Sequence, residues 1–165
     1  EFNFVVDEID AQEIEKIAIS STKIRNSINE GDLKTTKIYL GRFFSLTGKV
    51  VKGDGLGKQI DYPTANISIE EDYKIIPKDG VYYIKTTIDN NLYNGMMNIG
   101  HRPTIGTKEK SIEVNLFNFD RDIYDRVISI DVVEKIRDEK KFASIEALKT
   151  QLAKDQEHCL KLINK

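Results

Sequence analysis

The sequence predicts a mainly β domain, an antiparallel barrel or sandwich, over most of its length. From Leu46 onward, apolar and polar residues alternate with the period of two that is typical of strands with one buried face. Turn-forming residues separate these stretches, and no helical pattern intervenes before Ser144. Strands that follow one another without helices between them favour antiparallel pairing.

Six strands are expected, and two polar turns join some of them. Asp89-Asn90-Asn91 is expected to form a hairpin between the third and fourth strands, and Asp120-Arg121-Asp122 a hairpin between the fifth and sixth. The expected strands are Leu46 to Lys52, Thr64 to Ile69, Gly80 to Ile88, Leu92 to Ile99, Ser111 to Phe119 and Tyr124 to Ile136.

Short helices are expected before the strands. Ser20 and Ser21 can cap a helix from Thr22 to about Asn29 that ends at Gly31. Asp32 can cap a second helix that runs to about Tyr39. The chain opens on Phe2 to Val6, a short apolar stretch that predicts a strand, and this abrupt start suggests a fragment of a longer protein.

A final helix is predicted after Ser144, which is a suitable N-cap. Its apolar face is expected to close one side of the β domain. Cys159 lies on that face and is expected to be a small core residue, because its neighbour His158 points elsewhere on a helix. The face comprises Ile145, Leu148, Leu152, Cys159 and Leu162.

Composition limits the classes of function. The 25 Lys and Arg residues nearly balance the 27 Asp and Glu residues, for a formal net charge of −2, so the sequence indicates neither a nucleic-acid partner nor an anionic membrane partner. A single cysteine excludes an internal disulfide and favours a reducing compartment. No apolar stretch reaches membrane-spanning length, and we expect a cytoplasmic protein.

A glycine-rich loop follows the first expected strand. Gly53, Gly55, Gly57 and Lys58 lie just before Pro63-Thr64-Ala65-Asn66. Glycines allow backbone N–H groups to approach an anion closely, and Lys58 would add a charge. The spacing matches neither a Walker loop nor a dinucleotide-binding fingerprint, because Gln59 follows Lys58 and the next regular stretch is a strand. A plain glycine turn with a solvated lysine would explain the loop alone equally well.

The loop together with Pro63-Thr64-Ala65-Asn66 resembles the ATP-binding loop and PTAN motif of riboflavin kinases. The similarity covers about residues 46 to 163 in colinear order. Four further motifs carry it: Gly80-Val81-Tyr82, Asn98-Ile99-Gly100-His101-Arg102-Pro103-Thr104, Glu113-Val114-Asn115-Leu116 and Ile136-Arg137-Asp138-Glu139-Lys140-Lys141-Phe142.

The resemblance implies a fold and a reaction. The expected fold is a six-stranded antiparallel Greek-key barrel with a C-terminal helix, formed by a kinase domain at residues 45–165. The expected activity transfers the γ-phosphate of ATP to the 5′-hydroxyl of riboflavin, giving FMN and ADP with Mg²⁺. Riboflavin and ATP would then be the small-molecule partners.

A second resemblance concerns residues 1–44. Ile19-Ser20-Ser21-Thr22-Lys23-Ile24-Arg25, followed by Gly31 and Leu40-Gly41-Arg42, is similar to the closing segment of the FMN adenylyltransferase module of bacterial bifunctional FAD synthetases. That module's upstream nucleotide-binding loop does not occur in these residues, so this chain is not expected to make FAD by itself. The full-length protein is expected to carry the module N-terminal to the kinase domain.

The resemblance also assigns the reacting groups. Thr64 and Asn66 lie two residues apart, so both face the same side of an extended segment and would hold Mg²⁺ of the nucleotide, with Pro63 as a rigid start. Glu113 would be the base that takes the proton of the riboflavin hydroxyl. Residue pattern alone favours plainer explanations, a local turn for Thr64 and Asn66 and a solvent-facing glutamate. The kinase hypothesis requires that Glu113 face Thr64 and Asn66.

For the flavin, Arg137 could hydrogen-bond or stack on the ring and Phe142 could add an aromatic face. Phe142 could equally be a hydrophobic anchor for the start of the last helix. Arg102 lies in a second loop that the family places near its active site.

Two positions depart from the family pattern: Leu56 replaces a basic residue, and Asp61 replaces a glycine. An Asp61 side chain that pointed toward the phosphates would weaken nucleotide binding.

Two other functions fit parts of the sequence. A non-catalytic flavin- or nucleotide-binding barrel would keep the pocket without turnover. A small barrel that binds single-stranded nucleic acid would need a basic groove with aromatic residues, and the near-neutral charge argues against it.

Overall fold

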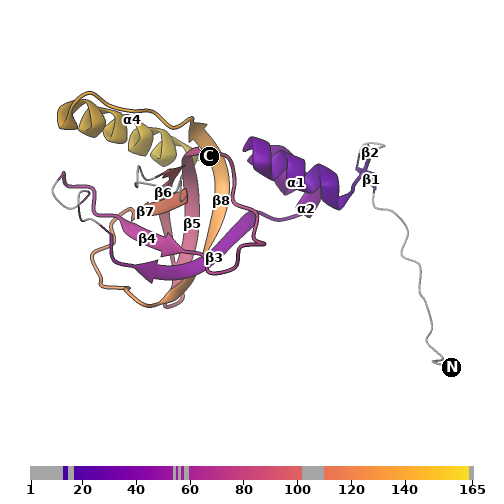
Figure 1. The fold of residues 1–165 in the computed structure, drawn as a ribbon, viewed down its shortest axis with the longest axis horizontal. Helices are drawn as coiled ribbons and strands as arrows, with labels where there is room; N and C mark the ends of the chain where they lie inside the picture. Colours follow the sequence, from indigo (N-terminus) through magenta and orange to yellow (C-terminus); the bar gives the residue numbers. More distant parts are fainter. Residues whose placement is uncertain are drawn as a thin grey trace.

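A closed barrel of six antiparallel strands forms the body of the protein (Figure 1). The structure is a computed structural model that describes residues 13–14, 17–53, 55, 57, 60–101 and 110–163. Around the barrel the strands follow the order β3-β4-β7-β6-β5-β8, which confirms the predicted Greek-key barrel. The strands are β3 (Phe44–Val51), β4 (Ala65–Ser68), β5 (Gly80–Ile88), β6 (Asn91–His101), β7 (Lys110–Leu116) and β8 (Val127–Arg137).

The turn between β5 and β6 is the hairpin that the sequence predicts. Asp89 and Asn90 have φ values of 50° and 63°. A two-residue hairpin turn needs this left-handed conformation, and Asp and Asn tolerate it better than most residues. Ile88 and Asn91 are paired directly across the turn.

The prediction of a hairpin at Asp120-Arg121-Asp122 is wrong. Residues 117–126 connect β7 to β8, but β7 lies between β4 and β6, and β8 lies between β5 and β3. The connection instead binds to β3, where the Asp125 N–H donates to the Val50 carbonyl at 2.9 Å and the Val50 N–H donates to the Arg126 carbonyl at 2.8 Å. Turn residues show where the chain reverses, whereas closure of the barrel decides which strands pair.

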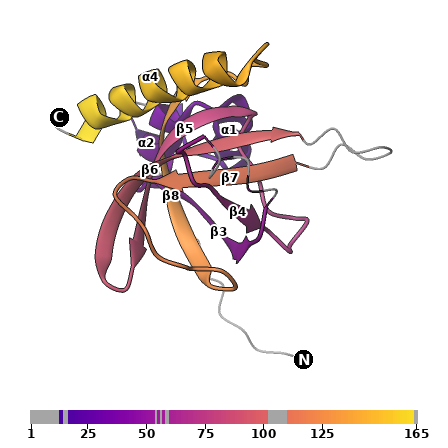
Figure 2. The ribbon, with the colours of Figure 1, turned by 90° about the vertical axis from the view of Figure 1, so that its left-hand side faces the viewer.

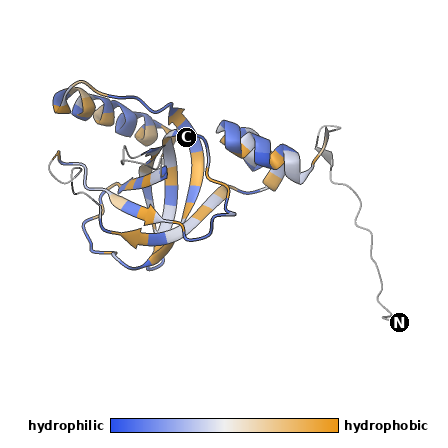
Figure 3. Ribbon diagram, in the orientation of Figure 1, coloured by the Kyte–Doolittle hydropathy of each residue, from blue (hydrophilic) through white to orange (hydrophobic). Residues whose placement is uncertain are grey.

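Apolar side chains fill the barrel, and we call this set the inner core. Figure 3 shows hydrophobic and hydrophilic bands along the strands, the alternation expected when one face is buried. The buried members are Leu33, Leu46, Val50, Ile67, Tyr82, Ile84, Ile88, Met97, Ile99, Ile112, Val114, Leu116, Ile123, Ile128, Ile130 and Val132.

Helix α4 (Ile145–Ile163) lies across the outside of the barrel and contacts β6 and β8 (Figures 1 and 2). Ser144 caps it as predicted, because its Oγ accepts the Ala147 N–H at 3.2 Å. Beneath the helix, a second group of apolar residues forms what we call the outer cluster. Its buried members are Val81, Tyr83, Met96, Phe117 and Cys159, with Leu152 and Leu162 packed against them.

The prediction that Ile145 belongs to the buried face of α4 is wrong. Ile145 is 52% exposed, so the buried face begins later, at half-buried Leu148. Helical periodicity identifies the apolar face of a helix, but it does not show which part of that face the barrel covers. Cys159 is fully buried as predicted, and burial followed by the charge of Asp155 raises the pKa of its thiol to about 12.

Two helices precede the barrel, α1 (Ser21–Glu30) and α2 (Leu33–Leu40), after the short strands β1 (Glu13–Ile14) and β2 (Ile17–Ala18). The predicted caps are confirmed: the Ser20 side chain accepts the Lys23 N–H, Gly31 ends α1 in the left-handed conformation, and the Asp32 side chain accepts the Thr35 N–H. The strand predicted at Phe2 to Val6 lies outside the described residues.

The helical segment packs on the barrel. Leu33 is buried within the inner core, and Lys34 Nζ lies 3.2 Å from Glu134 Oε1 of β8. Gly31 lies so close to Lys135 and Tyr82 that a Cβ there would stand 3.1 Å from each. Within the described residues, no helix is long and apolar enough to span a membrane.

Candidate active site

One row of residues crosses the outer face of the barrel from β4 to β8. Asn66 is paired with Glu113, Glu113 with Asn98, Asn98 with Val81, and Val81 with Arg137. Residues directly opposite each other on neighbouring strands point to the same face of a sheet. The polar side chains of β4, β7 and β6 therefore stand side by side, with Arg137 farther along the same row.

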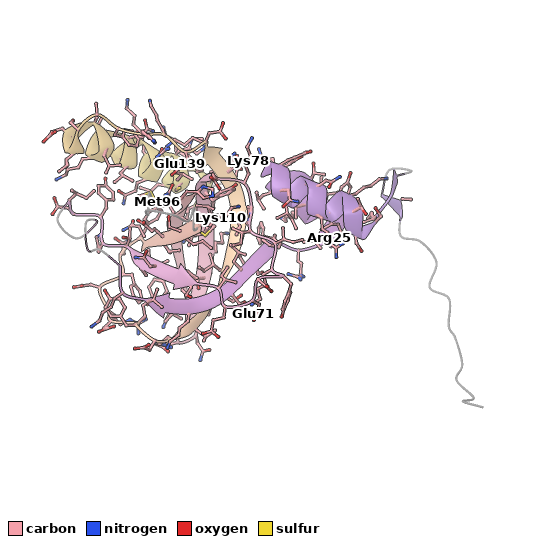
Figure 4. All side chains as sticks on the ribbon, viewed as in Figure 1. Arg25, Glu71, Lys78, Met96, Lys110 and Glu139 are labelled. Atoms are coloured by element: carbon pink, nitrogen blue, oxygen red, sulfur yellow. The ribbon has the colours of Figure 1, made fainter. Side chains whose placement is uncertain are left out.

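A pocket of about 230 Å³ lies over this row. Glu113 and Thr64 both line it, and Asn66 is the neighbour of Glu113 across the β4–β7 pair, so the structure brings the three residues to the same side of the barrel. Figure 4 shows Met96 and Glu139 beneath α4 on this side of the barrel. The lining residues are Gly57, Ile60, Tyr62, Thr64, Val81, Met96, Met97, Asn98, Glu113, Asn115, Arg137, Glu139, Lys140, Phe142, Leu148 and Leu152.

The glycine loop folds against the two proposed oxygen donors. A Cβ on Gly53 would lie 1.8 Å from Asn66 Nδ2, and a Cβ on Gly57 would lie 2.9 Å from Thr64 Oγ1. A side chain at either position would force the loop or these two side chains to shift. Gly55 has a φ of 72°, and no described atom lies within 4 Å of a Cβ added there.

Asn115 holds the start of the PTAN segment in place. It is 8% exposed, and its Nδ2 donates to the Pro63 carbonyl at 2.8 Å. The sequence places Asn115 on the same face as Glu113 but gives no sign of this bond, because Pro63 is distant in the chain. The bond fixes β7 to the segment that carries Thr64.

Arg137, the last residue of β8, is held by a buried carboxylate. Its Nη2 lies 2.8 Å from Asp155 Oδ2, and its Nε donates to the same oxygen at 2.9 Å. Its Nη1 donates to the Asp138 carbonyl at 3.0 Å. The guanidinium therefore forms a fixed part of the pocket wall.

Phe142 is half-buried on the pocket wall, before α4 begins. Its ring centroid lies 5.7 Å from the guanidinium carbon of Arg137 and 6.0 Å from Lys140 Nζ. Both distances fit cation–π contacts. The position satisfies both explanations that the sequence offers, a flavin contact and an anchor for α4.

Asp61 points away from the pocket. Its φ of 63° is the left-handed conformation, and its carboxylate is 84% exposed and lies 2.9 Å from Lys149 Nζ of α4. The turn therefore survives the replacement of glycine, and the carboxylate does not face the proposed phosphate site. Lys58, Leu56 and Arg102 lie outside the described residues.

The chemistry of the proposed oxygen donors suits a hard cation. Thr64 supplies a hydroxyl and Asn66 an amide oxygen, next to the Glu113 carboxylate, and Mg²⁺ prefers such oxygen ligands. The close approach of Gly53 and Gly57 leaves backbone rather than side chains against these donors. Among the described residues, no group of three or more His, Cys, Asp or Glu could hold a metal ion by itself.

Sequence reasoning missed Asp155 and Gln151. Asp155 is 2% exposed, and Gln151 Nε2 donates to its Oδ1 at 2.9 Å. A signal was available, because Asp155 falls on the apolar face of α4 between Leu152 and Cys159. A charged residue at such a position needs a buried partner.

A family model described as Flavokinase, riboflavin kinase, matches residues 40–163. The chain belongs to the riboflavin kinase family. It is 38% identical over 146 residues to a bifunctional riboflavin kinase/FMN adenylyltransferase of Bacillus subtilis (strain 168), a match that covers 87% of this chain and 46% of that protein. The chain thus spans about half the length of the curated relatives it matches.

Two solved structures share the fold. The riboflavin kinase from Trypanosoma brucei matches with a TM-score of 0.51 and 26% identity, over 73% of this chain and 80% of that one. A protein from Streptococcus pneumoniae named a macrolide-efflux protein matches with a TM-score of 0.83 and 37% identity, over 90% of this chain and 49% of that one. Family membership and the barrel together favour the catalytic hypothesis over a binding-only barrel.

Proposed function

We propose that this chain transfers the γ-phosphate of ATP to the 5′-hydroxyl of riboflavin, giving FMN and ADP. The observation that carries the proposal is the row across β4, β7 and β6, which sets Asn66 beside Glu113 under a pocket that Thr64 also lines. Phosphoryl transfer needs a cradle for the donor phosphates, a means to offset their charge and a base aimed at the acceptor. The glycine loop, the PTAN segment and Glu113 are the proposed sources of these three elements.

The donor side is the glycine loop with Thr64 and Asn66. Backbone N–H groups of the loop would bind phosphate oxygens, and Lys58 would add positive charge. Thr64 and Asn66 would hold the Mg²⁺ that enters with ATP. Bound Mg²⁺ would offset the charge on the transferred phosphoryl group.

Glu113 is the proposed base. A primary alcohol hardly ionises near neutral pH, so a positioned carboxylate that accepts its proton contributes about 10²- to 10⁴-fold to the rate. Glu113 comes from β7, across the sheet from Asn66. This position supports a role for Glu113 between the proposed nucleotide side and the opposite wall of the pocket.

The acceptor side is the wall formed by Arg137, Phe142 and the first half of α4. Phe142 offers a ring face and Arg137 offers N–H donors toward a flavin. The apolar side chains of Met96, Leu148 and Leu152 complete this side of the pocket. Arg102 is proposed to contribute to the same site, as the family resemblance implies.

The activity test follows FMN formation from riboflavin, ATP and Mg²⁺. We expect Glu113→Gln to lower kcat by about 10²- to 10⁴-fold, the usual contribution of a general base, with small changes in both KM values. The matched control is Glu70→Gln, which neutralises an exposed carboxylate just after β4 and should keep wild-type kinetics. Full activity in Glu113→Gln would eliminate the proposed base. Riboflavin binding without turnover in the wild type would instead support the non-catalytic barrel.

We further propose that the chain is the C-terminal part of a bifunctional protein, in which residues 1–44 end an FMN adenylyltransferase module. The lengths of the relatives and the helical segment packed on the barrel support this arrangement. Small-molecule substrates and the single cysteine fit the cytoplasmic location that the sequence predicts. The test is to assay FAD formation by the full-length protein and by this chain, and only the former should be active.

A further inference from the structure

Asp155 is a charged residue on the apolar face of α4. It is 2% exposed, and Cys159, one turn later on the same face, is fully buried. A buried carboxylate strongly destabilises a protein unless it is paired and hydrogen-bonded. Both oxygens of Asp155 are engaged, and the partner that engages both is Arg137.

The contacts between these residues leave the guanidinium little freedom. Arg137 Nε donates to Oδ1 at 3.1 Å and to Oδ2 at 2.9 Å, and Nη2 lies 2.8 Å from Oδ2. Gln151 Nε2 holds Oδ1 from the other side at 2.9 Å. Nη1 donates to the Asp138 carbonyl at 3.0 Å. Hydrogen bonds from both Nε and Nη1, with Nη2 in the ion pair, fix the plane of the guanidinium as well as its position.

The paired guanidinium still has donors to offer. It carries five N–H groups: the Nε group donates to Asp155, one Nη1 group donates to the Asp138 carbonyl, and Nη2 lies within ion-pair distance of Asp155 Oδ2. One N–H on Nη1 and at least one on Nη2 have no hydrogen-bond acceptor among the described residues. Arg137 lines the pocket, and its guanidinium carbon lies 5.7 Å from the centroid of Phe142.

A role in stability alone explains the pair poorly. Apolar side chains of similar volume would join α4 to β8 at least as well as a buried ion pair, which is weak evidence for stability. The outer cluster already joins the two elements through Cys159, Leu152 and Val133. The pair occurs where the strand end forms the pocket wall.

We propose that Asp155 is a positioning residue for the flavin acceptor, which fixes the Arg137 guanidinium so that its remaining N–H groups meet a polar group of the flavin beside Phe142. This proposal rests on the proposed function. It goes beyond that function because it gives a buried residue, which cannot touch the substrate, a role in riboflavin binding. Its consequence is selective: riboflavin binding depends on Asp155, whereas ATP binding does not.

The experiment measures riboflavin KM, MgATP KM and kcat for Asp155→Asn, together with riboflavin Kd from quenching of flavin fluorescence. The amide keeps the volume of the side chain but loses the charge and turns one donor toward Arg137. We expect riboflavin KM and Kd to rise roughly 10-fold, with MgATP KM unchanged within about 2-fold.

The matched control is Cys159→Ala, on the same face of α4. It should lower the thermal midpoint without changing riboflavin KM. A role in stability alone would give Asp155→Asn the same pattern, with a lower midpoint and wild-type riboflavin KM, and that result would overturn the proposal.

Arg137→Lys provides a second test that does not depend on the folding of Asp155→Asn. Lysine keeps the charge but cannot present a fixed fork. Riboflavin KM should rise in Arg137→Lys. The double variant Arg137→Lys/Asp155→Asn should show no further increase, because Asp155 acts through Arg137. A wild-type riboflavin KM in Arg137→Lys overturns the proposal. A wild type that binds no riboflavin and forms no FMN would instead reject the proposed function.

Discussion

Gly53 and Gly57 show how single residues shape the proposed phosphate site. Each glycine brings backbone against a side chain of the PTAN segment, Gly53 against Asn66 and Gly57 against Thr64. The loop can lie over the oxygen donors only because these two positions have no Cβ. The Asn115 bond to Pro63 then holds the segment from the opposite side.

Gly53→Ala tests the contact with Asn66. Its Cβ would lie 1.8 Å from Asn66 Nδ2, so either Asn66 or the loop must move. We expect kcat/KM for MgATP to fall by about 10-fold or more, since misplacement by about 1 Å costs up to about 10²-fold. Steady-state kinetics with varied MgATP measures the effect.

The control for this variant is Gly41→Asn at the end of α2. Gly41 has a φ of 68° and open space around its Cβ position, and Asn tolerates this conformation. The Gly41→Asn variant should keep the wild-type kcat/KM for MgATP. Wild-type kinetics in Gly53→Ala would show that the close approach of the loop is not needed.

Helix α4 covers the outer cluster and also supplies one wall of the pocket. Leu148 and Leu152 line the pocket, while Cys159 packs into the outer cluster. One helix thus links packing to the proposed acceptor site. The reactivity of the buried Cys159 thiol reports whether α4 stays packed on the barrel.

Cys159 should be unreactive in the folded protein. Burial, and next the charge of Asp155, raise the pKa of the thiol to about 12, so only about one molecule in 10⁴ carries the thiolate at pH 8. We expect negligible reaction with a disulfide reagent such as DTNB at pH 8, and rapid reaction in denaturant. Rapid labelling of the native protein would contradict the packing of α4 on the barrel.

At the scale of the whole molecule, closure of the barrel brings distant segments together. The β5–β6 turn meets the 117–126 connection at Asp89, whose Oδ1 lies 2.6 Å from Arg126 Nη2 and whose Oδ2 lies 3.1 Å from Arg121 Nη1. The hydrogen bond from Arg126, with the charges of both arginines, lowers the pKa of Asp89 below its ordinary 3.8.

This cluster should contribute to acid sensitivity. A carboxyl with a lowered folded pKa stabilises the fold above its ordinary pKa, and this contribution is lost as pH falls through the folded value. We expect the urea midpoint of Asp89→Asn to fall less than that of the wild type between about pH 5 and pH 2. Asparagine retains the left-handed turn, so the charge is the main change.

Salt and a neighbouring site provide the controls for the acid profile. The pair is exposed, so the difference should be small and should narrow in about 1 M salt. Asp120→Asn, an exposed carboxylate of the same connection, should follow the wild-type profile. Parallel curves for Asp89→Asn and the wild type would show that the cluster has no role in acid sensitivity.

Much of the fold and part of the site could be predicted from local patterns. Alternation located all six strands, and the caps at Ser20, Asp32 and Ser144 located the helices. The hairpin at Asp89-Asn90 follows from residues that tolerate positive φ. The motifs around Thr64, Asn66 and Glu113 predicted which side chains to examine, and the structure brings these three together; their chemical roles stay predictions.

The sequence by itself determined periodicity, capping and motif identity, because each depends on residues within a few positions of one another. Only the tertiary structure decided that β7 pairs with β4 rather than β8, that Gly53 lies on Asn66 and that Asp155 holds Arg137. These contacts depend on how the barrel closes and where α4 crosses it. Closure depends on all six strands at once, so no local pattern contains it.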